Sequence, residues 1–96
     1  MRQRDARYAI IKPMLNTGEI QSFVDIFKFI PKSVVAADLG KKVDRFTELM
    51  NRIEEFTVGE LLIIGNWCNL SISEMFKLVE AEYLKRINNF KTDVLP

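Results

Sequence analysis

Apolar residues recur at intervals of three and four along this chain, in segments separated by proline, glycine and asparagine. That interval places the apolar side chains on one face of an α-helix, whereas no sustained stretch alternates polar and apolar residues as a half-buried β-strand does. The connections between segments are short, at about two to four residues. The sequence therefore predicts an all-α fold of six helices.

Helix-start and helix-stop signals locate these segments. A serine or threonine followed three residues later by an acidic residue is typical of a capping box. Such pairs begin at Ser22, Thr57 and Ser71. The first helix is expected to extend from Asp5 to about Asn16, and Pro13 should kink or split it because proline removes a backbone donor. The residues of this helix expected to face the core are Ala6, Tyr8, Ala9, Ile10 and Met14.

The composition excludes several classes of function. The chain has no histidine, so it holds no Cys/His or Ser/His catalytic pair and no zinc site with a histidine ligand. Its one cysteine, Cys68, cannot form an intrachain disulfide, and beside Trp67 on an apolar helix face it is expected to be a buried thiol. We interpret the acidic residues near the second half of the chain as a solvated surface and predict no enzyme, no metal and no cofactor. These residues are Glu54, Glu55, Glu74, Glu80 and Glu82.

Neither a membrane span nor a secretion signal is predicted. The longest apolar run, Leu61 to Ile64, is far shorter than the roughly 20 residues of a membrane helix. The chain starts with the basic residues Arg2, Arg4 and Arg7, but the apolar stretch that follows is too short for a signal peptide. We expect one cytoplasmic domain in these 96 residues. Its expected parts are an N-terminal helical extension (1–19), a core (20–82) and a C-terminal helix extension with a tail (83–96).

The segment from Lys32 to Asn51 carries the most specific pattern in the chain. A helix-turn-helix sets two short helices at a steep angle, which requires core-facing apolar residues on both helices, a small residue where they approach and a glycine in the turn. Glycine is needed because the turn takes a left-handed conformation that strains other residues. All the required positions are filled in a single register, by Val35, Ala36, Leu39, Gly40, Val43, Phe46 and Leu49.

This segment and its neighbours resemble a known family. The stretch IFKFIPKSVVAADLGKKVDRFTELM, followed by FTVGELLIIGNWCNL, is similar to small bacterial members of the XRE-type helix-turn-helix family, which includes the phage repressors and Cro. The resemblance covers roughly residues 20–82. It implies a five-helix repressor-like domain, here with an extra N-terminal helix and an extended C-terminal helix. It also implies a sequence-specific DNA-binding regulator of transcription.

In that family the second motif helix lies in the major groove of double-stranded DNA. For this chain the resemblance assigns that role to the helix from Val43 to Arg52, and Arg52 itself is among the residues expected to bind DNA. Arg45 would contact guanine and Asn51 adenine, while Asp44 and Glu48 would accept hydrogen bonds from cytosine amines. Contacts to phosphates are expected from Lys32, Ser33, Lys41, Lys42 and Thr47.

The distribution of charge both supports and limits this interpretation. The net charge is only +1, but residues 31–52 hold five basic and three acidic residues, while residues 53–82 hold one basic and six acidic residues. Asp44 and Glu48 lie one turn apart on the surface that would meet a polyanion, where an unpaired carboxylate lowers affinity. The alternative is a non-catalytic protein-interaction module, antitoxin-like or an adaptor, that keeps the helix-turn-helix as a scaffold.

The last helix carries the longest apolar stripe, which has two interpretations. The stripe comprises Ile72, Met75, Phe76, Val79, Tyr83, Ile87 and Phe90. Its first half is expected in the core, whereas its second half extends past the core and would stay uncovered in a monomer. We expect a homodimer that holds two motif helices about 34 Å apart, one turn of DNA. The expected interface residues are Val79, Tyr83, Ile87 and Phe90. The alternative is packing of this half on the N-terminal helix.

Overall fold

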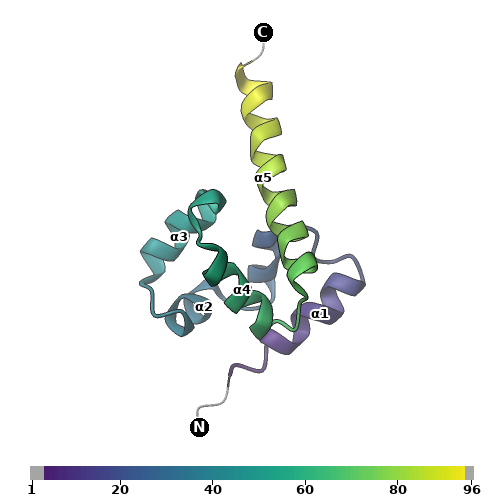
Figure 1. Ribbon diagram of the computed structural model, residues 1–96, viewed down its shortest axis with the longest axis vertical. Coiled ribbons are helices and arrows are strands. Elements are labelled where there is room, and N and C mark those ends of the chain that lie inside the picture. The colour runs from purple at the N-terminus through teal and green to yellow at the C-terminus, as the bar shows by residue number, and fades with distance from the viewer. Residues whose placement is uncertain (1–3, 95–96) are drawn as a thin grey trace.

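Every element in the described part of the chain is helical. The computed structural model describes the backbone of residues 4–94 and the side chains of residues 4–88. In chain order the elements are α1 (Tyr8–Asn16), the 3-10 helix η1 (Phe23–Lys28), α2 (Lys32–Asp38), α3 (Val43–Asn51), the 3-10 helix η2 (Ile53–Glu55), α4 (Val58–Trp67) and α5 (Ile72–Val94). The predicted all-α fold is confirmed for these residues (Figure 1). Within residues 4–94, no helix combines the length and the apolar character that crossing a bilayer requires.

Side-chain caps start α4 and α5 at the predicted residues. The Thr57 hydroxyl accepts the backbone N–H of Glu60 at 3.0 Å, and the Glu60 carboxylate accepts the N–H of Thr57 at 2.9 Å. Ser71 and Glu74 are bonded in the same reciprocal way, at 2.9 and 3.1 Å. Each pair satisfies two backbone donors that the first turn of a helix would otherwise leave open.

The segment after Ser22 is shorter and tighter than its spacing predicted. The Asp25 carboxylate accepts the N–H of Ser22 at 3.1 Å, as the capping pattern predicted. The element that follows, η1, is a 3-10 helix of six residues rather than an α-helix. Proline disfavours the helical conformation in the residue before it, so Pro31 leaves no room for a further turn after η1.

Four phenylalanines hold η1, α3 and the connection between η2 and α4 together. Their rings meet edge to face in a closed circuit, with neighbouring centroids 5.4 or 5.5 Å apart. In order around the circuit they are Phe23, Phe27, Phe46 and Phe56. Each such pair adds roughly 0.5–1.5 kcal/mol beyond the burial of its surface. Because Phe46 is one of the two buried residues of α3, the phenylalanine circuit helps to set which face of α3 points to solvent.

The core-facing side of α1 was predicted only in part, since Tyr8 is buried and Met14 packs against the core as expected. The helix begins at Tyr8 rather than at Asp5, whose carboxylate instead accepts a backbone N–H two residues later at 2.9 Å. Tyr8 and Ile11 are buried. The prediction was wrong for three residues that are exposed, namely Ala6, Ala9 and Ile10.

Two contacts of Tyr8 explain this orientation. Its hydroxyl donates to Asp38 at 2.8 Å, and its ring centroid lies 5.5 Å from that of Trp67. Burial and the bond to Asp38 raise the pKa of Tyr8 far above its ordinary value, so the hydroxyl remains a donor. Pro13 does not split α1. The carbonyl that it leaves without a donor belongs to the exposed residue Ala9, where water can bind it.

α5 is the longest element, and its last turns extend beyond the other helices (Figure 1). It has 23 residues, which is about 34 Å of helix. The face that it buries against the rest of the protein consists of Met75, Leu78 and Glu82. The predicted apolar stripe lies mostly beside this face. Phe76 and Val79 are half-buried, and Ile72 is exposed.

Glu82 was predicted on a solvated surface, and that prediction was wrong, because only 3% of its surface is exposed. Its carboxylate accepts the backbone N–H of Val24 at 3.2 Å and lies 3.6 Å from the Arg86 guanidinium. Arg86 also donates to the carbonyl of Met50, near the end of α3. A buried carboxylate is tolerated when it is paired and hydrogen-bonded. These contacts therefore fix α5 against η1 and α3 together.

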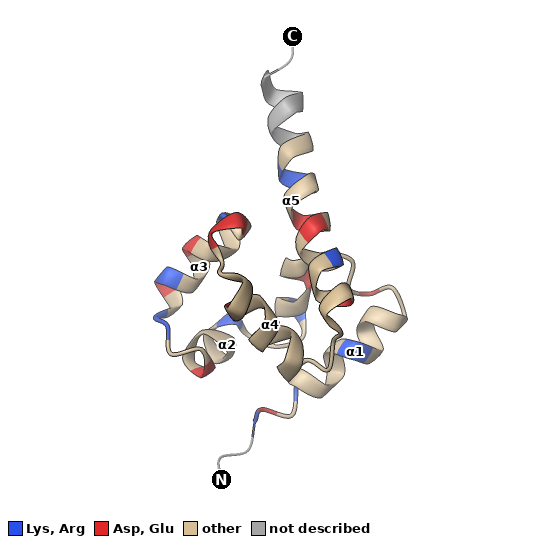
Figure 2. Ribbon diagram, in the orientation of Figure 1, with Lys and Arg blue, Asp and Glu red and all other residues tan. Residues whose placement is uncertain are grey.

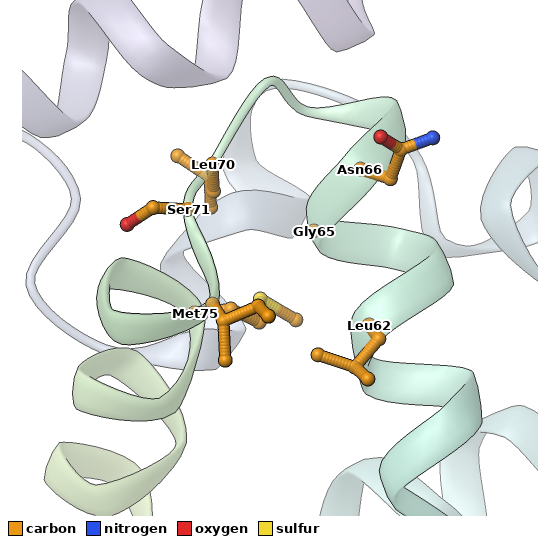
Figure 3. A pocket seen from close by; sticks show the side chains of 7 residues that line it. Leu62, Gly65, Asn66, Leu70, Ser71 and Met75 are labelled. Atoms are coloured by element: carbon orange, nitrogen blue, oxygen red, sulfur yellow. The ribbon is translucent and has the colours of Figure 1, made fainter.

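α4 and α5 approach each other closely at Gly65. A β-carbon at this position would lie 3.2 Å from the Met75 side chain, tighter than an ordinary contact. A hollow opens beside this approach (Figure 3). Its lining is Leu62, Gly65, Asn66, Leu70, Ser71, Ile72 and Met75. Because none of these residues is charged, the hollow offers no group for acid–base chemistry.

The turn between α2 and α3 yields a test of the fold. Gly40 has a φ of +73°, and a β-carbon there would meet no atom within 4 Å. Gly40→Val should lower the free energy of unfolding by roughly 1–2 kcal/mol, because valine is strained in the left-handed conformation. Gly40→Asn should cost less, since asparagine tolerates that conformation. Urea unfolding followed by circular dichroism measures both, and equal stability of all three proteins would contradict the assigned turn.

Candidate nucleic-acid interface

A tight turn joins α2 to α3. The N–H of Lys41 donates to the Ala36 carbonyl at 2.9 Å. This bond closes the end of α2, and the left-handed conformation of Gly40 makes it possible. The apolar residues of the motif that are buried or half-buried, as predicted, are Val35, Ala36, Leu39, Phe46 and Leu49. The two helices therefore pack through the residues that the pattern selected.

Val43 is the exception among the motif residues. It was predicted to face the core, but 41% of its surface is exposed. Val43 is the first residue of α3, and a helical side chain points back toward the start of its own helix. Its side chain therefore extends past the part of α3 that α2 covers.

The outer face of α3 is exposed and carries both signs of charge (Figure 2). The predicted DNA-contacting residues exposed on this face or at its end are Asp44, Arg45, Glu48, Asn51 and Arg52. Thr47 is half-buried, and its hydroxyl donates to the Val43 carbonyl at 2.9 Å. That bond within the helix makes Thr47 a poorer phosphate ligand than the spacing predicted.

Both arginines of this face are paired with carboxylates. Arg45 Nη1 lies 3.6 Å from Glu48 Oε1 and 4.0 Å from Glu55 Oε1. Arg52 Nε lies 3.0 Å from Glu55 Oε2 and 4.0 Å from Glu54 Oε2. All five side chains are more than a third exposed, so water screens the pairs and each is worth about 0.2–1 kcal/mol. The arginines can therefore exchange these partners for others at little cost.

Lys41 is tied to α4. Its Nζ lies 2.6 Å from Glu60 Oε2, and both side chains are mostly covered. Partial burial acts to raise the pKa of Glu60, but the bonds from Lys41 and from the Thr57 backbone outweigh it and hold the pKa below its ordinary value. Lys42, the next residue, is exposed, so it is the lysine of this turn best placed to meet a phosphate.

Lys32 and Ser33, the other predicted phosphate contacts, form the first turn of α2 and are exposed. α2 has seven residues, or about 10 Å of helix. Apart from Thr47, which lies within α3, the predicted phosphate-contacting residues therefore fall into two groups, one at each end of α2.

Sequence reasoning missed the acidic residues that pair with this basic surface. Glu54 and Glu55 were assigned to a solvated surface with no partner. The spacing of Arg52 and Glu55, three residues apart, was a signal that could have found that pair. Glu60 was identified as a cap of α4. Its contact with Lys41 could not be predicted, because the two residues are far apart in the sequence and no local spacing indicates the pair.

The predicted dimer residues lie along one side of α5. Val79 and Ile87 are half-buried, and 44% of the surface of Tyr83 is exposed. The side chain of Phe90 lies outside the described residues. α1 contacts α4 and the first turn of α5 instead (Figure 1). For Tyr83 and Ile87 the structure therefore contradicts the alternative in which the N-terminal helix covers the stripe.

Cys68 is buried, as predicted. Burial raises the pKa of its thiol to about 12, so the thiol is protonated near neutral pH and is a poor nucleophile. Among the described residues, no group of three acidic, cysteine or histidine side chains is placed to hold a metal ion.

Comparisons of this chain with family models, with curated proteins and with solved structures found no match. The arrangement of the residues is therefore what supports a functional assignment. That arrangement presents an exposed helix with donors and acceptors of the kind that bind the edges of bases.

The pair between Lys41 and Glu60 predicts a pH-dependent contribution to stability. A carboxyl whose pKa is depressed on folding stabilises the fold above its unfolded pKa, and the effect is lost as pH falls through the folded pKa. Lys41→Met should thus lower the free energy of unfolding by about 1 kcal/mol at pH 7. The difference from the natural protein should shrink below pH 4.5, the ordinary pKa of this carboxyl. Urea unfolding at pH 7 and pH 3 measures it, with Lys42→Met as the control. A pH-independent difference would contradict the pair's contribution.

Proposed function

We propose that the protein is a sequence-specific DNA-binding regulator of transcription, in the manner of the XRE-type repressors, and that it acts as two copies. The observation that carries this proposal is the turn at Gly40, which packs the inner face of α3 on the core and leaves its outer face in solvent. A helix of this kind, beside a second helix and across a tight turn, fits the major groove of double-stranded DNA. A cytoplasmic location is part of the proposal, since bacterial DNA lies there.

The side chains on this face suit direct contact with bases. Arg45 offers the paired donors that match guanine, and Asn51 offers the donor and acceptor that match adenine. Val43, exposed at the start of α3, adds an apolar group of the kind that contacts the methyl group of thymine. Lys42 and Lys32 supply cations for phosphates at the two ends of α2.

The carboxylates of this surface shape how it would bind. Arg45 and Arg52 must leave Glu48, Glu54 or Glu55 to contact DNA, and the carboxylates then face a polyanion unless they accept hydrogen bonds from cytosine amines. This lowers affinity for DNA of arbitrary sequence more than for a site with bases that satisfy these groups. We therefore propose a protein that binds DNA with moderate affinity and high sequence specificity.

Selection from a random pool of DNA duplexes, repeated across a salt series, tests the proposal directly. We expect enrichment of one motif. Arg45→Ala should weaken binding to that motif by roughly 1–3 kcal/mol and weaken binding to random DNA by less. Lys77→Ala, an exposed cation on α5, is the matched control and should bind as the natural protein does. Absence of enrichment together with absence of binding at low salt would refute the proposal. Equal loss on every sequence would show that Arg45 contacts only phosphate.

Glu55 gives an independent test, because it pairs with both arginines. Glu55→Gln removes the competing charge and should raise affinity for all duplexes at low salt by roughly two- to five-fold, the scale of an exposed ion pair. Glu19→Gln changes the same charge on an exposed residue before η1 and should have no such effect. Fluorescence anisotropy with a labelled duplex measures both. An unchanged or lower affinity for Glu55→Gln would place the DNA elsewhere on the protein.

The second candidate is a non-catalytic protein-interaction module of the antitoxin or adaptor kind. It is favoured by the carboxylates that form ion pairs with Arg45, Arg52 and Lys41. A surface whose charges are already paired suits a protein partner better than a polyanion. The selection experiment separates the two, since this candidate predicts no duplex binding at any salt concentration.

A further inference from the structure

An apolar groove, here called the α5 groove, lies between α5 and η2. It is lined by Ile53, Glu54, Phe76, Val79, Glu80 and Tyr83. An adjoining hollow shares Glu54 and Tyr83 with it and continues along α5 to Ile87. Because the charged side chains of the first hollow are carboxylates, the groove repels a polyanion. The adjoining hollow is lined by Arg52 and Arg86 as well as by Glu54. An occupant of both must therefore offer an apolar surface with charges of both signs along its length.

The apolar positions on this side of α5 are spaced symmetrically. They are 76, 79, 83, 87 and 90, at intervals of three, four, four and three. The intervals are the same from either end, and Tyr83 is at the centre. In a two-fold symmetric pair each contact occurs twice, with the two residues exchanged between the copies. Two antiparallel α5 helices centred on Tyr83 would therefore match each apolar position with another apolar position.

The charges along α5 favour the antiparallel arrangement over a parallel one. Apart from Glu82, which is buried and bonded within its own copy, residues 72–82 contain two acidic residues and one basic residue, whereas residues 83–88 contain two basic residues and no acidic residue. An antiparallel pair sets the acidic half of one helix beside the basic half of the other. A parallel pair would set like charges together, which is unfavourable.

We infer that the α5 groove binds the α5 helix of a second copy of this chain, antiparallel and centred on Tyr83. The end of each α5 extends beyond its own copy (Figure 1) and lies along the groove of the other. Tyr83 then meets its own counterpart, and Ile87 faces Val79 of the partner copy. The inference stands on apolar spacing and charge without any DNA, and it supplies the second copy that the proposed function uses.

Cysteine cross-linking tests the register of the pair. Under mild oxidation without DNA, Tyr83→Cys should form a disulfide-linked dimer, because position 83 meets itself. Val79→Cys and Ile87→Cys should each stay uncrosslinked alone but form a dimer when the two are mixed. Native Cys68 is buried, so it does not interfere. Dimers of each single variant, with none specific to the mixture, would show a parallel pair and overturn the inference.

Association without any cross-link provides the second measurement. Sedimentation equilibrium of the natural chain should show a dimer, and Tyr83→Asp should weaken the association roughly tenfold or more. Leu84→Asp is the matched control, since Leu84 is also exposed, at 49% against 44% for Tyr83, but lies about 100° around the helix. It should dimerise as the natural chain does. A monomeric natural chain, or equal effects of the two variants, would overturn the inference, whatever the outcome with DNA.

Discussion

The circuit of four phenylalanine rings is the contact on which the rest of the structure depends. It joins residues from η1, from α3 and from the connection before α4, so three separate segments share one apolar centre. Edge-to-face packing is directional, and the circuit therefore fixes the rotation of α3 about its own axis as well as its position. Because Phe46 is held inside, helical spacing directs Arg45 and Glu48 to the solvent-facing side of α3. The chemistry of the outer face thus follows from an apolar contact beneath it.

The electrostatics of that outer face are balanced rather than strongly basic. Arg45 and Arg52 each lie within 4.0 Å of two carboxylates, and Lys41 is bonded to Glu60. A surface of this kind gains little from long-range attraction to a polyanion. Any preference for a partner must then come from short-range complementarity, in which donors and acceptors meet matching groups. This is why the same surface suits a selective DNA site or a protein partner better than non-specific DNA binding.

The parts of the fold that local rules control could be predicted from the sequence. The caps at Thr57 and Ser71 and the left-handed Gly40 each depend on residues within a few positions, and the outward residues of α3 follow from helical spacing. The rest depends on distant partners. Glu82 is buried because Val24 offers it a backbone donor, and no property of the sequence around Glu82 reports that. The pairing of the arginines likewise depends on where η2 brings its carboxylates after α3 ends.

The bond from Arg86 to the Met50 carbonyl links the proposed dimer helix to the proposed DNA-contacting helix. The contacts of Glu82 hold the same part of α5 against η1. In a symmetric pair joined through α5, these contacts restrict how far the two copies of α3 can move relative to each other. One extra base pair between half-sites would rotate the second half-site by roughly a tenth of a turn. The second copy of α3 would have to rotate with it to keep its contacts, and the bonds of Arg86 and Glu82 oppose such a movement. If the proposed function holds, binding therefore depends on the spacing of the two half-sites as well as on their sequence.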